Sequence, residues 1–178
     1  MKNWLGDIFG GKRMAALTVG TTAPDFTLPT MDGKQFSLKE ALARGPVLAA
    51  FFKISCPVCQ FAFPYLERIF KAHGNRNVTM VGISQNGKKD TAAFIKEYGV
   101  SFPVLLDDTN SYLASNAYGL TNVPSLFWIA PDGRIEISSV GWNRKEIDEI
   151  NQKAGATSGK KLPSIFSPSE NVPEFRAG

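Results

Sequence analysis

The two cysteines of the chain, Cys56 and Cys59, are separated only by Pro57 and Val58. Pro57 is typical of the first turn of a helix, because the N–H that proline lacks has no partner at that position. A thiol at a helix N-terminus lies beside unpaired N–H groups and the positive end of the helix dipole, and both favour its thiolate form. The second thiol then lies one turn away, close enough to form a disulfide. This spacing predicts a redox-active dithiol with Cys56 and Cys59 as its catalytic residues.

Two other roles for the cysteine pair remain open. A structural zinc site needs four ligands, and the chain adds only one histidine, His73, to the two thiols. A metal-carrier protein built on Cys56, Cys59 and His73 would therefore need carboxylates or a second chain. A purely structural disulfide is the other alternative, although closing so short a loop removes little chain entropy. We expect neither a resident metal nor a cofactor.

The elements around the cysteines follow from hydrophobic patterning. The apolar run Val47–Phe52 is typical of a strand buried on both faces. Helical spacing of apolar residues continues to Lys71, with Pro64 expected to kink the helix or remove one backbone bond. A hairpin is expected around Asp32-Gly33, followed by a short helix opening at Ser37 with a capping box. We expect further strands at 78–83, 103–107, 125–130 and 134–140, and further helices at 88–98, 111–118 and 145–154.

Strands that alternate with helices and end in a hairpin and a helix predict an α/β fold, with a mixed central sheet and helices on both faces. We divide the chain into an N-terminal appendage over 1–20, with a short amphipathic helix at 2–9, and a main globular domain over 21–154. The Ser-, Gly-, Pro- and Lys-rich remainder, 155–178, is expected to be an extended or mobile tail.

Composition excludes several classes of function. The chain has 178 residues, 43% of them hydrophobic, which suits one globular domain. Its net charge of +4 comes from scattered basic residues, so we expect no nucleic-acid partner. The apolar run around 46–52 is far shorter than the roughly 20 residues of a membrane span. Asp7 interrupts any signal-peptide core, so a chain starting at Met1 is expected to be cytoplasmic.

Several motifs together resemble the thioredoxin superfamily. They are a strand ending in Phe51-Phe52, Cys56-Pro57-Val58-Cys59 opening a helix, Pro64 five residues later, and Val123-Pro124 before a late strand. Ala23-Pro24-Asp25-Phe26, the stretch Tyr98–Asp107 and Pro131-Asp132-Gly133 look like its TlpA-like and AhpC/TSA-type redoxins, which carry an insertion in the thioredoxin core and here an N-terminal hairpin extension. The resemblance covers about residues 20–153.

The resemblance implies a cis bond at Val123-Pro124, with the backbone of Val123 presented to an extended partner. Gly141 and Trp142 follow the last strand near the same edge, where Trp142 either forms a docking wall or fills the core. The residues expected to bind substrate are Ser55, Pro57, Val58, Val123, Pro124, Gly141 and Trp142. Lys53 is either a candidate for tuning the ionisation of Cys56 or a strand-end charge reaching solvent.

The implied activity is thiol–disulfide exchange with protein or small-molecule disulfides, sustained by a reducing partner such as a thioredoxin-type system. A peroxiredoxin-like peroxidase, with Cys56 peroxidatic and Cys59 resolving, is the runner-up. Peroxiredoxins place Pro and Thr or Ser where Ala49 and Lys53 stand, and the arginine before their late strand falls near Pro124. Because no imidazole separates the cysteines, we expect a reductant more than a strong oxidant.

The resemblance also leaves the proton acceptor of the reaction open. Thioredoxins often bury a carboxylate six residues before the first cysteine, where this chain has Ala50. Some TlpA-like proteins carry a Glu three residues after the second cysteine, where this chain has Ala62. The sequence therefore predicts the dithiol without identifying the group that takes its proton.

Overall fold

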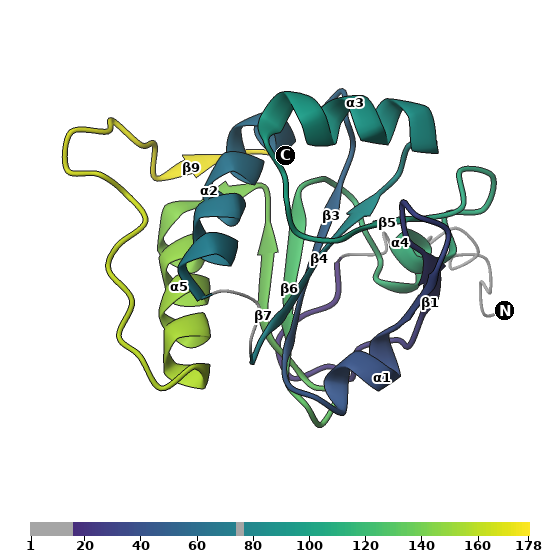
Figure 1. The fold of residues 1–178 in the computed structure, drawn as a ribbon, viewed down its shortest axis with the longest axis horizontal. Helices are drawn as coiled ribbons and strands as arrows, with labels where there is room; N and C mark the ends of the chain where they lie inside the picture. Colours follow the sequence, from purple (N-terminus) through teal and green to yellow (C-terminus); the bar gives the residue numbers. More distant parts are fainter. Residues whose placement is uncertain (1–15, 74–76) are drawn as a thin grey trace, which may run out of the picture.

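A five-stranded mixed sheet forms the centre of the computed structural model, which describes residues 16–73 and 77–178 (Figure 1). The expected helix at 2–9 lies outside the described residues. The strand order is β5-β4-β3-β6-β7, with β3, β4 and β5 parallel and β6 antiparallel to both its neighbours. The strands are β3 (Val47–Phe52), β4 (Thr79–Ser84), β5 (Val104–Leu106), β6 (Ser125–Ile129) and β7 (Ile135–Val140).

Helices cover both faces of this sheet, because its central strands are apolar on both sides. In β3, Leu48, Ala50 and Phe52 pack into one core cluster and Val47, Ala49 and Phe51 into the other. The first cluster is closed by helices α2 (Pro57–His73), α3 (Lys88–Tyr98) and α5 (Arg144–Thr157). The second is closed by helices α1 (Leu38–Leu42) and α4 (Leu113–Ala117) and by the hairpin of β1 (Thr27–Pro29) and β2 (Gln35–Ser37). The predicted fold class is confirmed.

Most of the predicted elements form where their local signals place them. The expected helix at 88–98 coincides with α3, and Ser37 caps α1 by accepting a hydrogen bond from the N–H of Glu40. Gly33 adopts a positive φ of 85° in the turn between β1 and β2. Helix α2 continues through Pro64 to His73, so this proline does not end the helix. Helix α5 runs three residues beyond the predicted end at Ala154.

Both outer strands of the central sheet are partly covered by other parts of the chain. On β5, the turn of the hairpin supplies a bridge from Thr30 to Leu105 and a hydrogen bond from the N–H of Met31 to the carbonyl of Val104. On β7, Ile135 exchanges backbone hydrogen bonds with the segment Gly20–Thr21. The N-terminal residues before β3 therefore contact opposite edges of the sheet.

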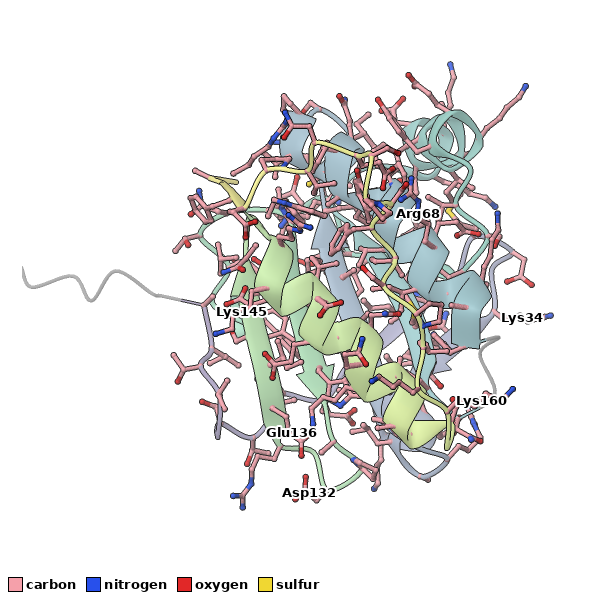
Figure 2. The ribbon with its side chains drawn as sticks, turned by 90° about the vertical axis from the view of Figure 1, so that its left-hand side faces the viewer. Lys34, Arg68, Asp132, Glu136, Lys145 and Lys160 are labelled. Carbon is pink, nitrogen blue, oxygen red and sulfur yellow. The ribbon has the colours of Figure 1, made fainter. Side chains whose placement is uncertain are left out.

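Residues 158–178 form an ordered strap over α2 and α5, which Figure 2 shows crossing beside Arg68. Four apolar side chains of the strap are buried: Leu162, Ile165, Phe166 and Val172. The strap ends in β9 (Phe175–Arg176), which pairs antiparallel with β8 (Trp142–Asn143). We predicted neither β8 nor β9, because two-residue strands carry no alternating pattern.

Within residues 16–73 and 77–178, no helix combines the length and apolar character needed to cross a bilayer.

Candidate active site

The two cysteines lie where β3 ends and α2 begins. Cys56 directly precedes Pro57, the first residue of α2, and its N–H donates to the carbonyl of Lys53 at 3.1 Å. The N–H of Cys59, the third residue of the helix, donates to the sulfur of Cys56 at 3.3 Å. Cys56 thus occupies the N-cap position, and its Sγ takes the place of the usual side-chain oxygen. The start of the helix therefore directs a backbone hydrogen-bond donor at this sulfur.

The two sulfurs differ in their access to solvent. Both are free thiols in the structure, Cys56 being half-buried and Cys59 fully buried. Burial raises the pKa of the Cys59 thiol, so this group keeps its proton at neutral pH. The half-buried sulfur of Cys56 is therefore the one that can meet a substrate first, and the buried sulfur of Cys59 lies behind it.

The loop before β6 faces the dithiol. The Val123-Pro124 peptide bond is cis, as the resemblance implied. The carbonyl oxygen of Val123 accepts a hydrogen bond from Sγ of Cys56 at 3.2 Å. The carbonyl of Pro124 is bound by the N–H of Gly141 at 2.8 Å, which connects this loop to the chain entering β8. The structure thus brings Cys56, Val123, Pro124 and Gly141 together.

Two amide side chains that the sequence did not single out hold the loop before Cys56. Asn86 accepts a hydrogen bond from the N–H of Ile54 at 3.0 Å, and Gln60 donates to the carbonyl of Ile54 at 2.9 Å. Asn86 follows the end of β4, where side chains of neighbouring parallel strands meet. The position of Asn86 just after a predicted strand was the sequence signal that could have identified it as a site residue.

The remaining predicted site residues fall into two groups. Ser55 and Pro57 are exposed and Val58 is half-buried beside the reactive sulfur, and Lys53 is also exposed at the end of β3. Pro124, Gly141 and Trp142 are buried.

Trp142 takes the core position that the sequence left as its second alternative. It is 0% exposed, its ring packs edge-on against Phe61 at 4.8 Å between centroids, and its Nε1 donates to the carbonyl of Pro173. Of the two alternatives for Trp142, the structure shows the core packing, because the strap covers the ring.

Apolar side chains surround Ala50 and Ala62, the two positions at which related proteins carry a carboxylate. Ala50 and Ala62 both lie in the first core cluster with Cys59. The buried carboxylate of α2 is Glu67, which binds the backbone N–H of Ser101 at 2.8 Å as well as the Ser101 hydroxyl. Glu67 therefore fixes the segment leading into β5 and is not directed to the dithiol.

The metal-carrier alternative does not fit the geometry. His73 ends α2, fourteen residues after Cys59. At about 1.5 Å per helical residue, the two are roughly 20 Å apart. The His73 ring is buried with its Nε2 3.1 Å from Sδ of Met80, and burial lowers its pKa. Among the described residues, no group of three or more His, Cys, Asp or Glu side chains is placed to hold a metal.

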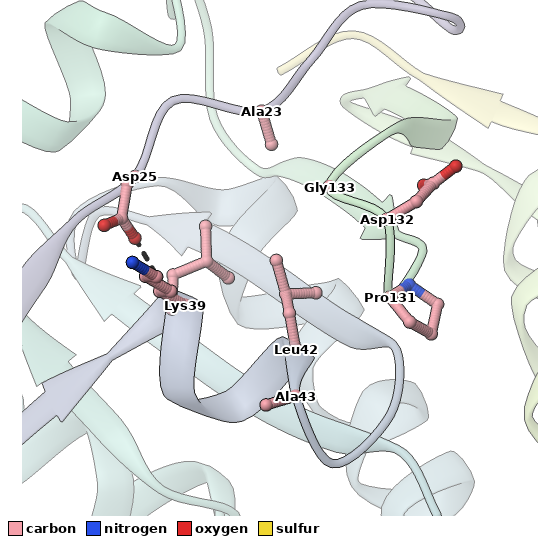
Figure 3. A pocket seen from close by; sticks show the side chains of 9 residues that line it. Ala23, Asp25, Lys39, Leu42, Ala43, Pro131, Asp132 and Gly133 are labelled. Atoms are coloured by element: carbon pink, nitrogen blue, oxygen red, sulfur yellow. Dashed lines mark hydrogen bonds between the residues drawn. The ribbon is translucent and has the colours of Figure 1, made fainter.

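A surface pocket lies near the N-terminal end of β3, whereas the cysteines follow its C-terminal end. It is formed by α1, by the turn after β6 and by the segment before β1 (Figure 3). Asp25 in this pocket accepts a hydrogen bond from the backbone N–H of Lys39 at 3.2 Å. Its position separates it from the dithiol, and its lining is mostly apolar, with residues such as Leu42 and Pro131. We do not assign it to the active site.

Comparison with known proteins places the dithiol in a family context. Residues 19–138 match the model of the AhpC/TSA family. The thiol-disulfide oxidoreductase ResA of Bacillus subtilis is 31% identical over 156 residues, covering 85% of this chain and 84% of the relative.

Solved structures agree with this placement. A thiol:disulfide interchange protein of the thioredoxin family from Chlorobium tepidum is 29% identical, with a TM-score of 0.64 over 78% of this chain and 99% of that one. The thioredoxin domain of a thiol-disulfide oxidoreductase from Bacteroides vulgatus is 21% identical, with a TM-score of 0.69 over 78% of this chain and 98% of that one. The latter likeness supports the fold alone.

Proposed function

The chain belongs to the AhpC/TSA family of thioredoxin-like redoxins, and we propose that it exchanges disulfides through the Cys56–Cys59 pair. It is a thiol–disulfide oxidoreductase. The observation that carries the assignment of roles is the asymmetry of the two thiols. Cys56 is partly exposed with the N–H of Cys59 on its sulfur, and Cys59 is buried one helical turn behind.

The mechanism follows from this arrangement. The Cys56 thiolate attacks one sulfur of a substrate disulfide, forms a mixed disulfide and releases the other substrate sulfur as a thiolate. Cys59 then loses its proton and attacks Sγ of Cys56, so that the chain becomes the Cys56–Cys59 disulfide and the substrate leaves as a dithiol. Because burial raises the pKa of Cys59, this second step is the one that depends on a proton acceptor.

We propose that the substrates are disulfide-bearing proteins; the printed names of the relatives describe those proteins as a thiol-disulfide oxidoreductase and a thiol:disulfide interchange protein. The exposed residues Ser55 and Pro57 and the backbone of Val123 are the surfaces a polypeptide would contact first. We propose that the chain acts as a reductant and that a thioredoxin-type dithiol system restores its reduced form. A cytoplasmic location stays a prediction from the sequence.

The peroxidase alternative gains no support from the site. Ala49, where peroxiredoxins carry proline, is buried in the core cluster on the opposite face of the sheet from Cys59. Lys53, where they carry a hydroxyl, is exposed. Neither residue supplies a hydroxyl donor for a peroxide oxygen beside Cys56.

The test is reduction of insulin by the pre-reduced protein, with Cys56→Ser and Cys59→Ser as variants. We expect no turnover from either variant and a stable mixed disulfide only with Cys59→Ser, detected by mass spectrometry. Full activity of Cys56→Ser would refute the assignment of roles. Stopped-flow mixing with hydrogen peroxide supplies the second arm, in which a fast loss of both thiols would favour the peroxidase. The reduction potential measured against glutathione tests the proposed direction of electron flow.

A further inference from the structure

Residues 174–178, called here the cover segment, lie against the surface that faces the dithiol. The strap is firmly held up to this point, since Val172 is buried and the carbonyl of Pro173 accepts the indole N–H of Trp142 at 2.7 Å. Further back, Arg68 binds Glu170 through both its terminal nitrogens and also donates to the carbonyl of Ile165. These contacts fix the position of the strap up to Pro173, and so the point beside Trp142 from which the cover segment starts.

The cover segment pairs with the backbone of β8. Phe175 and Arg176 form β9 opposite Asn143 and Trp142, and the N–H of Arg144 donates to the carbonyl of Glu174 at 2.9 Å. The guanidinium of Arg176 lies over the ring of Phe61, 4.1 Å from its centroid. The segment thus occupies a strand edge immediately after the Gly141 position.

The end of the cover segment reaches the loop that contacts Cys56. A Cβ atom built on Gly178 would lie 2.3 Å from the carbonyl oxygen of Val123, and one built on Gly141 would lie 2.6 Å from the carbonyl oxygen of Arg176. Asn122 donates from its side-chain amide to the carbonyl of Gly178 at 2.8 Å. The oxygen of Val123 approached by Gly178 is the one that Sγ of Cys56 contacts at 3.2 Å. The reactive thiol and the cover segment therefore meet at the same carbonyl.

The contacts of the cover segment are weaker than those of the strap that holds it. The side chain of Phe175 is 60% exposed, and the ion pair between Arg144 and Glu174 is open to solvent. Exposed ion pairs contribute little to stability, and a two-residue strand has few backbone bonds. Residues 174–178 can therefore leave while the strap up to Pro173 stays in place.

We propose that the cover segment is an intramolecular occupant of the polypeptide-binding face of the enzyme, so that an extended disulfide-bearing chain must displace it before pairing with β8 and the loop of Val123. The inference rests on the proposed function. Because only the open fraction of molecules binds such a substrate, the segment lowers the apparent affinity for polypeptides. A small disulfide that needs only Sγ of Cys56 is affected less.

The test compares the full chain with a chain shortened after Pro173 and with Gly178→Ala, which keeps every other residue. Ala177→Ser is the matched control, since Ala177 is exposed in the same segment. We expect both changes at the cover segment to raise kcat/KM for insulin by about five-fold or more. The gain should come from a lower KM, because fewer molecules are in the covered state that cannot bind the polypeptide. With 5,5′-dithiobis(2-nitrobenzoate) the change should stay within about two-fold. Circular dichroism and the melting temperature check that each variant folds.

A second readout does not depend on turnover. In Cys59→Ser trapped with a cysteine-bearing peptide, the backbone amides of residues 174–178 should lose their protection from hydrogen exchange, because the cover segment itself has been displaced from β8. Unchanged or lower kcat/KM for insulin in the folded shortened chain and in Gly178→Ala, or retained protection of the cover segment in the trapped complex, would overturn the inference and leave the proposed function intact. Failure of the unaltered chain to reduce insulin at all would instead count against the proposed function.

Discussion

The sulfur of Cys56 lies 3.2 Å from the carbonyl oxygen of Val123 and 3.3 Å from the backbone nitrogen of Cys59, so one atom joins the cis-proline loop to the start of α2. The thiol hydrogen has an acceptor on the loop, and the lone pairs of the sulfur have a donor on the helix. The position of Sγ is therefore defined from two sides.

The two thiols should differ in their reaction with an alkylating reagent. In the folded, reduced protein, iodoacetamide should modify Cys56 at least about tenfold faster than Cys59, because Cys59 is fully buried. Peptide mass spectrometry after timed quenching measures both rates. In Cys56→Ser, labelling should appear only after denaturation; labelling of folded Cys56→Ser at the wild-type rate would show that Cys59 is accessible.

The reduced protein should lose stability as the pH rises above about 8.5, the ordinary pKa of a cysteine. Burial raises the pKa of Cys59, so the native state keeps a proton that the unfolded chain releases, and the free energy of unfolding falls with pH. The limiting slope is about 1.4 kcal/mol per pH unit for one group. Tyr118, whose pKa burial also raises, adds to the loss above about pH 10. Urea unfolding at several pH values between about 8.5 and 10 measures how steeply the free energy of unfolding falls with pH.

The matched variant for this pH dependence is Cys59→Ala in the reduced state. Its free energy of unfolding should fall less steeply with pH than that of the unaltered chain between about pH 8.5 and 10, where Tyr118 does not yet contribute. Equal slopes would mean that another group causes the alkaline loss.

Asn86→Ala should destabilise the protein by about 1–2 kcal/mol and slow insulin reduction, because the partly buried N–H of Ile54 loses its acceptor. The loop carrying Cys56 then loses one of its two amide supports. Urea unfolding and the split between kcat and KM measure the two effects. Asn171→Ala, at an exposed position of the strap, is the control and should change neither. If Asn86→Ala reduced insulin with wild-type kinetics, Asn86 would not be needed to position the loop that carries Cys56.

Glu170→Gln should destabilise the protein near neutral pH and make little difference in strong acid. Arg68 holds the pKa of the Glu170 carboxyl at about 2, below its ordinary value. Its contribution is therefore present above the ordinary pKa of about 4.3 and disappears as the pH falls toward 2. Melting temperatures of the two proteins should converge across that range. Glu149→Gln, an exposed carboxylate of α5, controls for the change in net charge; a constant difference at all pH values would contradict the argument.

The sequence predicted those parts of the fold whose signals are local. The apolar run of β3, the helical spacing of α3 and the Ser37 cap each lie within one short segment, and each was confirmed. The cysteine spacing at the start of α2 was equally local. The cis bond at Val123 came from family resemblance rather than from patterning.

The rest of the site depends on contacts between distant segments. Asn86 meets Ile54 across 32 positions, and Trp142 meets Pro173 across 31. From the sequence, Trp142 after the last strand could equally line the rim of the active site or pack in the core. Only the path of the strap, which covers the ring, distinguishes the two. The pairing of β8 with β9 is too short for any periodic signal.

The coverage of the outer strands described above has a consequence for association between molecules. An open strand edge is a template for adding a strand from another chain, which leads to aggregation or domain exchange. Here the hairpin turn shields β5 through Thr30 and Met31, and Gly20–Thr21 shields part of β7. Lengthening or deleting the hairpin turn should therefore promote self-association through β5 before it affects the chemistry of the cysteines, which follow the end of β3, two strands away from β5 in the sheet.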